Sequence, residues 1–313
     1  MQYIRLMRPG DWVKNLFILL PALFWLASPL REASNVTFAA VIARTAITFG
    51  GFCLLASAVY CVNDALDAEK DRTHPVKRNR PVASGAVSPF AALVLGGALC
   101  ALAILISLTL HKGVTLVFIL YLFLQVVYNF GAKYVVLVDV IVLSLGFVLR
   151  AAAGAYGIDI KLSVWLLLCV FFLCLYLGFI KRLCDYSSAH REEGTKWRSP
   201  AGYDDPLEIS WLLGVSAVLS VMMYLTYTLS VHAYSVFGVR AAGLAALSPL
   251  VIIVIHRFYR RANLGLSDSP LRAILDDRVV QIGTVLYIGG VIAVLYVPMV
   301  DRALQALLVS PME

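Results

Sequence analysis

The 313 residues are 61% hydrophobic and only 14% charged, and their mean hydropathy is +0.84. Soluble domains carry about 25% charged residues. Apolar runs of about 20 residues, long enough to cross a bilayer as a helix, recur along this chain. The composition therefore excludes a soluble globular protein and indicates a polytopic membrane protein.

Nine apolar stretches predict an all-α, polytopic bundle of nine transmembrane helices. Pro21 interrupts the first stretch and no small-residue cleavage site follows, so we interpret it as a retained helix and not as a signal peptide. Because no segment between the stretches is long enough to fold alone, residues 1–313 are expected to form a single transmembrane domain. The predicted helices cover residues 15–30, 37–60, 90–110, 114–130, 134–156, 162–180, 208–231, 239–256 and 279–299.

The distribution of lysine and arginine predicts the orientation. With the N-terminus in the cytoplasm, 19 of these residues lie in cytoplasmic segments and 5 in outside segments, while Arg44 and Arg150 lie within spans. The net charge of +7 then reflects topology and does not indicate a nucleic-acid partner. The long loops 61–89 and 181–207 face the cytoplasm in this arrangement, so we expect them to carry the chemistry.

Three aspartates gather where the second predicted span ends. Asp64, Asp67 and Asp71 are spaced i, i+3 and i+7, and Asn63 is one helical turn before Asp67, so all four share a face if the helix continues. Exposed like charges at this spacing repel each other by about 0.2–0.5 kcal/mol per pair. A cation should offset this repulsion. The pattern predicts a Mg²⁺ site whose shell is completed by phosphate oxygens and water.

A basic loop follows the aspartates directly. Lysine and arginine bind phosphate oxygens through charge-assisted hydrogen bonds. The two segments together therefore predict a site for a diphosphate that is held by Mg²⁺. The alternative is a solvated positive loop of the kind common at cytoplasmic surfaces. The candidate phosphate ligands of this loop are Lys77, Arg78 and Arg80, and Arg72 and His74 lie beside them.

A second group of charges closes the sixth predicted span. Lys181 and Asp185 share a helix face at i, i+4, and Arg182 lies next to them. One carboxylate with two cations suits an anion clamp that contacts the substrate. The alternative is a salt bridge at a helix end together with interfacial anchors.

Further polar residues lie at or within the spans. Lys14 and Asn15 open the first span, where Lys14 is either a phosphate ligand or an interfacial anchor. Asp139 and Arg150 lie on one face of the fifth span, but about 16 Å of helical rise separates them, so they cannot pair with each other. Since charges in the hydrocarbon region line cavities or pair, Asp139 is a candidate substrate contact, and Arg150 is expected to hold a structural partner or a buried water. The turn between the fourth and fifth spans adds two more candidates, Tyr128 and Lys133.

The aspartate pattern, followed by "RTHPVKRNRPVASG", resembles the first aspartate motif of the UbiA superfamily of membrane prenyltransferases. The resemblance covers nearly the whole chain and is strongest to the decaprenyl-phosphate phosphoribosyltransferase branch. It implies nine transmembrane helices and Mg²⁺ as cofactor. It also implies that the three aspartates are catalytic metal ligands at the cytoplasmic face of a bacterial plasma (inner) membrane. The segments that carry the branch resemblance are 8–15, 71–85, 128–154, 178–183 and 256–278.

The branch resemblance implies a reaction in which polyprenyl phosphate attacks C1 of phosphoribosyl diphosphate and diphosphate leaves. Many superfamily members carry a second D-x-x-x-D pattern after the sixth span, but Ala189 takes the place of its second aspartate here. This departure disfavours the first alternative, the transfer of an isoprenoid from its diphosphate to an aromatic acceptor. The second alternative is a transporter or lipid flippase. Transporters usually place ionisable groups near the bilayer midplane, whereas these charges crowd one surface.

Overall fold

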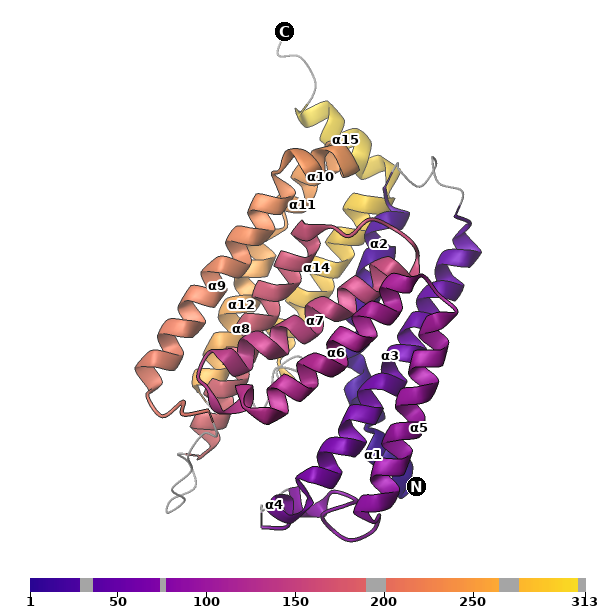
Figure 1. Cartoon of the computed structure of the whole chain (residues 1–313). Coiled ribbons are helices and arrows are strands. Elements are labelled where there is room, and N and C mark those ends of the chain that lie inside the picture. The colour runs from indigo at the N-terminus through magenta and orange to yellow at the C-terminus, as the bar shows by residue number, and fades with distance from the viewer. Residues whose placement is uncertain (29–35, 74–76, 190–200, 265–275, 309–313) are drawn as a thin grey trace. The chain divides into compact units, whose positions relative to one another are not determined.

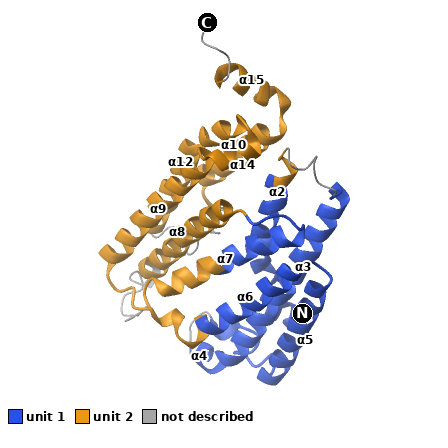
Figure 2. Ribbon diagram, turned by 45° about the horizontal axis from the view of Figure 1, so that its top comes forward, with its two compact units in different colours: residues 1–24, 35–127, 146–162 blue, residues 25–34, 128–145, 163–313 orange. Residues whose placement is uncertain are grey.

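The computed structural model describes residues 1–28, 36–73, 77–189, 201–264 and 276–308. Every regular element within these ranges is a helix, as predicted (Figure 1). The chain divides into two compact units, which Figure 2 colours separately. Unit 1 comprises residues 1–24, 35–127 and 146–162, and unit 2 comprises residues 25–34, 128–145 and 163–313.

Unit 1 is built around α3 (Phe38–Leu66), an apolar helix of 29 residues. The Thr37 side chain caps its first turn by accepting a hydrogen bond from the Ala40 N–H at 3.3 Å. Helix α5 (Pro89–Leu108) lies alongside α3 and begins in the same way, with Ser88 as its cap (Figure 1). The two helices form the frame that supports the N-terminal segment and the aspartate motif.

Besides α3 and α5, the described part of unit 1 contains the N-terminal segment, the loop after α3 and parts of three further helices. Helix α6 (Lys112–Phe130) lies mostly in unit 1, and α7 (Val138–Gly157) and α2 (Leu20–Leu26) are each divided between the two units. The shorter elements of unit 1 are α1 (Gln2–Met7), the 3₁₀ helix η1 (Pro9–Leu19), α4 (Ala68–Arg72) and the 3₁₀ turn η3 (Lys77–Asn79).

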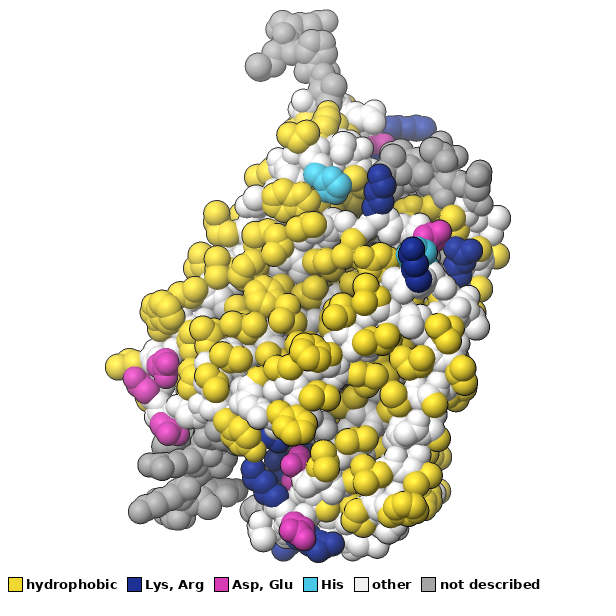
Figure 3. All heavy atoms as spheres, viewed as in Figure 1, with side chains coloured by type: hydrophobic (Ala, Val, Ile, Leu, Met, Phe, Trp, Pro, Cys, Tyr) yellow, Lys and Arg dark blue, Asp and Glu magenta, His cyan; other side chains and the backbone are white. Residues whose placement is uncertain are grey.

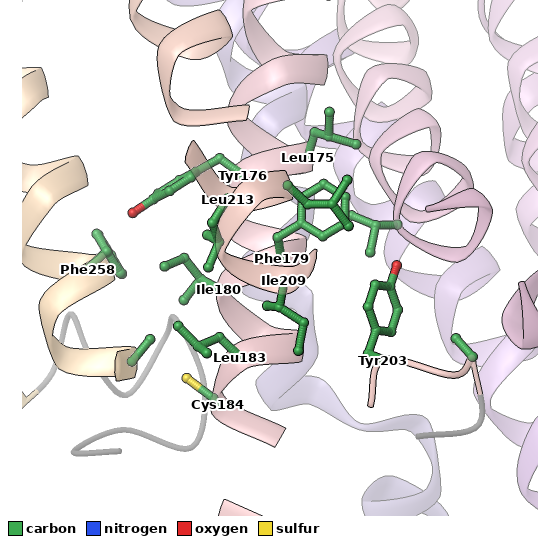
Figure 4. Packing of buried hydrophobic residues seen from close by; sticks show 14 of the residues in the cluster. Leu175, Tyr176, Phe179, Ile180, Leu183, Cys184, Tyr203, Ile209, Leu213 and Phe258 are labelled. Carbon is green, nitrogen blue, oxygen red and sulfur yellow. The ribbon is translucent and has the colours of Figure 1, made fainter. Parts of the chain in front are cut away.

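Unit 2 has its core between α8 (Val164–Ala189), α9 (Pro206–Thr228) and α12 (Ser248–Asn263). Large apolar side chains from these helices meet in one cluster, in which Phe179 and Tyr203 are each 1% exposed (Figure 4). The cluster therefore holds the segment before α9 against α8. The other elements of unit 2 are η4 (Ala132–Tyr134), α10 (Val231–Phe237), α11 (Arg240–Ala245), α14 (Arg278–Tyr296) and α15 (Pro298–Leu308).

Eight helices in the described ranges are long and apolar enough to cross a membrane, and they coincide with the second to ninth predicted spans. The predicted count of nine is not confirmed. The first predicted span, 15–30, is not one of the eight, because it does not form a single long α-helix. It consists of η1 followed by α2, and residues 29 and 30 lie outside the described residues. The outer faces of the long helices carry mainly hydrophobic side chains, as a polytopic membrane protein requires (Figure 3).

Candidate active site

The aspartate motif of unit 1 lies where α3 passes into α4. Helix α3 ends at Leu66 and Asp67 forms a turn, but the hydrogen bonds from Asp67 N–H to Asn63 O (2.9 Å) and from Asp71 N–H to Asp67 O (2.8 Å) preserve the helical spacing. Asp64 and Asp71 are buried, with exposures of 1% and 4%. The prediction of a common face is confirmed for these two residues, because both contact the same arginine.

That arginine is Arg80, which comes from the basic loop. Its Nη1 lies 2.5 Å from Asp71 Oδ2 and 3.4 Å from Asp64 Oδ1. A second guanidinium, from Arg8, forms an ion pair with Asp64 Oδ1. The two buried carboxylates are therefore neutralised by two arginines. Sequence reasoning selected Arg80 but missed Arg8, because Arg8 is far from the motif along the chain.

The carboxylates fit a Mg²⁺ ion in part. Asp64 Oδ2 is buried and has no hydrogen-bond partner among the described residues, so one carboxylate oxygen is available for a cation. Magnesium usually takes one or two protein carboxylates and fills its shell with phosphate oxygens and water. Within the described ranges no group of three or more His, Cys, Asp and Glu side chains is arranged to hold a metal. The predicted ligand set of Asp64, Asp67 and Asp71 therefore stays a prediction, with Asp64 and Asp71 as its better-placed members.

The rest of the basic loop is less closely associated with the carboxylates. Lys77 and Arg78 belong to η3 and have exposed side chains. The Arg72 Nε–H donates to Ala83 O at 3.3 Å, which ties the two ends of the loop together. Of the predicted phosphate ligands, the structure brings Arg80 to the aspartates, and phosphate binding by Lys77 and Arg78 stays a prediction.

The start of the chain supplies two further predicted residues, which have different surroundings. Lys14 lies 2.5 Å from Asp11 Oδ1, and its side chain is 44% exposed. Asn15 is buried, donates to Cys53 Sγ at 3.2 Å and accepts from Arg150 Nε at 2.8 Å. The structure therefore uses both ends of the Asn15 amide internally. Substrate binding by Lys14 and Asn15 stays a prediction.

Arg150 has the structural partners expected of a charge within a span. Besides Asn15, its guanidinium donates to Tyr121 Oη at 3.1 Å and to Gly146 O at 2.9 Å. The rings of Phe52, Tyr121 and Phe147 surround it, with centroids 5.0–5.1 Å from Cζ. These contacts join η1, α3, α6 and the second half of α7 inside unit 1.

Unit 2 contains a separate buried ion pair at the start of α7. Asp139 is fully buried, and its Oδ2 lies 2.8 Å from Arg182 Nη2. Its Oδ1 accepts hydrogen bonds from the Tyr203 hydroxyl at 2.6 Å and from the Val140 N–H at 2.7 Å. Asp139 therefore pairs with Arg182 of the second charged group, on α8, and its predicted contact with the substrate stays a prediction.

Tyr203 is a residue that sequence reasoning missed. Its hydroxyl oxygen also accepts the Leu137 N–H at 2.8 Å, so one side chain joins the segment before α9 to the start of α7. Burial and the hydrogen bond to Asp139 raise the pKa of Tyr203 above its ordinary value, which keeps the hydroxyl protonated as a donor. No spacing rule could have found this contact, because the two residues are 64 positions apart.

The remaining candidates in unit 2 lie around Arg182. Tyr128 hydrogen-bonds to Arg182, and Asp185 Oδ2 lies 3.4 Å from Arg182 Nη1. Lys181 points to the exposed side of α8, and Lys133 lies over the ring of Tyr134 at 5.4 Å. Lys181 and Arg182 therefore have different environments, although they are adjacent in sequence. Their role as an anion clamp stays a prediction.

Comparisons with known proteins extend over most of the chain. The model of the UbiA prenyltransferase family matches residues 15–276. The chain is 33% identical to the decaprenyl-phosphate phosphoribosyltransferase of Mycolicibacterium smegmatis, over 94% of this chain and 92% of that protein. It is 32% identical to the Corynebacterium glutamicum protein of the same name, over 94% of this chain and 86% of that protein. A UbiA homologue from Archaeoglobus fulgidus, solved with DMAPP and Mg²⁺, has the same fold. Its TM-score is 0.66 at 19% identity, covering 95% of this chain and all of that one.

Proposed function

Because this chain belongs to the UbiA prenyltransferase family, we propose that it transfers the 5-phosphoribosyl group from phosphoribosyl diphosphate to a polyprenyl phosphate. The observation that carries the proposal is the extent of the match to relatives that are named for this activity. Three such proteins, of M. smegmatis, C. glutamicum and Mycobacterium tuberculosis, are 31–33% identical over 92–94% of this chain.

The proposed reaction makes few chemical demands on the protein. An oxygen of the lipid phosphate forms a bond to C1 of the ribose, while the bond from C1 to the diphosphate oxygen breaks. The lipid phosphate is already an anion at neutral pH, so no strong general base is required. The protein must bring two anionic substrates together and stabilise the negative charge that develops on the departing diphosphate.

The unit 1 site supplies groups suited to the diphosphate. Asp64 and Asp71 would hold Mg²⁺, with Asp67 as a further ligand, and the ion would neutralise charge on the leaving diphosphate. Arg80 already contacts both buried aspartates, so its guanidinium would lie beside a diphosphate that is bound there through Mg²⁺. Lys77 and Arg78, exposed at the start of the same loop, add positive charge.

The proposal also includes the location of the site. The aspartate motif belongs to the loop 61–89, which the distribution of lysine and arginine assigns to the cytoplasm. Phosphoribosyl diphosphate is a soluble, highly charged metabolite, so a site on the cytoplasmic face of a bacterial plasma membrane gives it direct access. The lipid substrate would enter from the bilayer.

Transfer of radiolabel tests the function directly. The full-length protein in nanodiscs, given Mg²⁺, polyprenyl phosphate and ribose-labelled phosphoribosyl diphosphate, should move the label into the lipid extract and release one diphosphate per transfer. The Asp64→Asn variant is the matched control and should transfer little label. If a prenyl diphosphate and an aromatic acceptor react while phosphoribosyl diphosphate does not, the isoprenoid-transfer alternative replaces this proposal.

A further inference from the structure

Arg8 occupies an unusual position beside the aspartate motif. It lies between α1 and η1 with left-handed backbone angles, φ 52° and ψ 61°, although it is not glycine and although Pro9 follows it. Left-handed backbone is unfavourable for such residues and persists where the surrounding structure holds it. In this conformation the guanidinium pairs with Asp64 and lies over the Tyr60 ring, 4.8 Å from its centroid.

Ser57 of α3 contacts residues on both sides of Arg8, the backbone of Met7 and the side chain of Trp12. Its hydroxyl donates to Met7 O at 2.9 Å and accepts from Trp12 Nε1 at 3.1 Å, and it is fully buried. Leu6, also fully buried, packs against residues of α3 and α5. These contacts fix the backbone next to Arg8 against the last turns of α3. The Arg8 side chain, which is 26% exposed, is the part that can move.

The charges at this site favour a change of hydrogen-bond acceptor for Arg8, from a carboxylate to a phosphate oxygen. Asp64 and Asp71 are balanced by Arg8 and Arg80, so a divalent cation that binds the carboxylates, for example at Asp64 Oδ2, competes with both guanidiniums for the same negative charge. A bound metal diphosphate also brings phosphate oxygens, and the planar guanidinium of arginine bonds those as well as it bonds a carboxylate. A bound metal diphosphate would therefore offer Arg8 a phosphate oxygen as a new acceptor, while the metal ion draws on the charge of Asp64.

We propose that Arg8 is a diphosphate ligand that pairs with Asp64 until a metal diphosphate binds. When a metal diphosphate binds, the Arg8 side chain passes from the Asp64 carboxylate to a non-bridging diphosphate oxygen, while the backbone stays fixed by Ser57. No covalent bond changes in this step. The inference rests on the proposed function for the identity of the organic substrate, but it concerns the diphosphate group alone.

Binding measurements on the full-length protein in detergent test the exchange without turnover. The probes are Mn²⁺, followed by electron paramagnetic resonance, and inorganic diphosphate titrated in the presence of Mn²⁺. Arg8→Gln removes the guanidinium, Arg8→Lys keeps a charge without the planar fork, and Arg5→Gln is the matched control. Arg5 is an exposed arginine of α1 whose removal changes the net charge equally.

The proposal predicts opposite shifts in Arg8→Gln. Mn²⁺ alone should bind more tightly, because its competitor for Asp64 is gone. Diphosphate should bind about 10- to 100-fold more weakly, the range that follows from losing one charged hydrogen bond. Arg8→Lys should lie between the variant and the wild type, and Arg5→Gln should match the wild type in both measurements.

Three outcomes would overturn the proposal. Unchanged Mn²⁺ and diphosphate affinities in Arg8→Gln would make the ion pair incidental. A parallel loss of both affinities with a lower melting temperature would make Arg8 a purely structural residue. Tighter Mn²⁺ with unchanged diphosphate would show competition without transfer. If the wild type binds Mn²⁺ and diphosphate as described but does not use phosphoribosyl diphosphate, the proposed function fails while the inference about Arg8 stands.

Discussion

Arg182 and Asp139 form an ion pair in which the carboxylate is fully buried and the guanidinium is 16% exposed, with 2.8 Å between Nη2 and Oδ2. The pair connects α8 to the first turn of α7 within unit 2. Tyr203 and the Val140 N–H satisfy the other carboxylate oxygen. Two residues predicted as substrate contacts are thus joined to each other, and this relationship has measurable consequences.

Breaking this pair from one side should destabilise the protein strongly. Arg182→Ala leaves a buried carboxylate without its counter-ion, a change that costs about 3–5 kcal/mol of unfolding free energy. The double variant Asp139→Asn/Arg182→Gln removes both charges and should recover much of the loss. Thermal unfolding in detergent, followed by tryptophan fluorescence, measures both effects. If the single variant is as stable as the wild type, the pair is not formed in the folded protein.

The buried aspartates of unit 1 should be required for turnover. Asp64→Asn and Asp71→Asn keep the shape of the side chain but remove the charge that would bind Mg²⁺, so kcat should fall about 100-fold or more, the scale of losing one strong electrostatic contact in a transition state. Asp67→Ala should also lower the rate, and by less, because Asp67 is only half-buried.

Glu69→Gln is the matched control for the aspartate variants, since Glu69 is an exposed carboxylate of α4. It should retain the wild-type rate. Initial rates of label transfer over a range of Mg²⁺ concentrations measure all four variants. Near-normal turnover of Asp64→Asn at saturating Mg²⁺ would contradict the assignment of the metal site.

Arg80 should affect the soluble substrate more than the lipid. Arg80→Ala removes the guanidinium that bridges Asp64 and Asp71 and leaves the diphosphate with one cation fewer, so the KM for phosphoribosyl diphosphate should rise about tenfold or more. The KM for polyprenyl phosphate should change little. Lys70→Ala, an exposed change in α4, is the control. Equal increases in both KM values would point to a general structural role for Arg80.

The stability of unit 2 should depend on the charge of Asp277 at acid pH. Asp277 begins α14, and its carboxylate lies 2.9–3.2 Å from donors of Arg257, Arg261 and the N–H groups of Val279 and Val280. Burial alone would raise the pKa of Asp277, but these hydrogen bonds outweigh it and hold the pKa well below its ordinary value.

A carboxylate with a lowered folded-state pKa stabilises the protein above its unfolded pKa, which is about 3.9 for aspartate, and loses this contribution as the pH falls toward the folded value. Asp277→Asn should therefore lower the melting temperature at pH 6 to 7, and the difference from the wild type should shrink below about pH 4. A constant difference between pH 7 and pH 3 would show that the charge of Asp277 does not contribute. Asp276→Asn is the neighbouring control.

Local sequence patterns were enough to predict the helical membrane fold and the shared face of the aspartates. The lengths of the apolar stretches predicted an all-helical membrane protein, because crossing the bilayer requires about 20 apolar residues in each helix. The spacing of Asp64 and Asp71 predicted that they share a face, and the helical hydrogen bonds through Asp67 preserve that spacing. These features depend on helix geometry alone, so the sequence was enough to predict them.

The partners of those residues were decided only by tertiary structure. Arg8 pairs with Asp64 across 56 positions, Tyr203 with Asp139 across 64, and Arg150 with Asn15 across 135. No periodicity relates such residues, since their distance depends on how whole helices pack and on which buried polar groups must be satisfied. The sequence alone therefore predicted the aspartates and the basic loop that follows them, and packing decided that Arg8, from the first turns of the chain, would pair with Asp64.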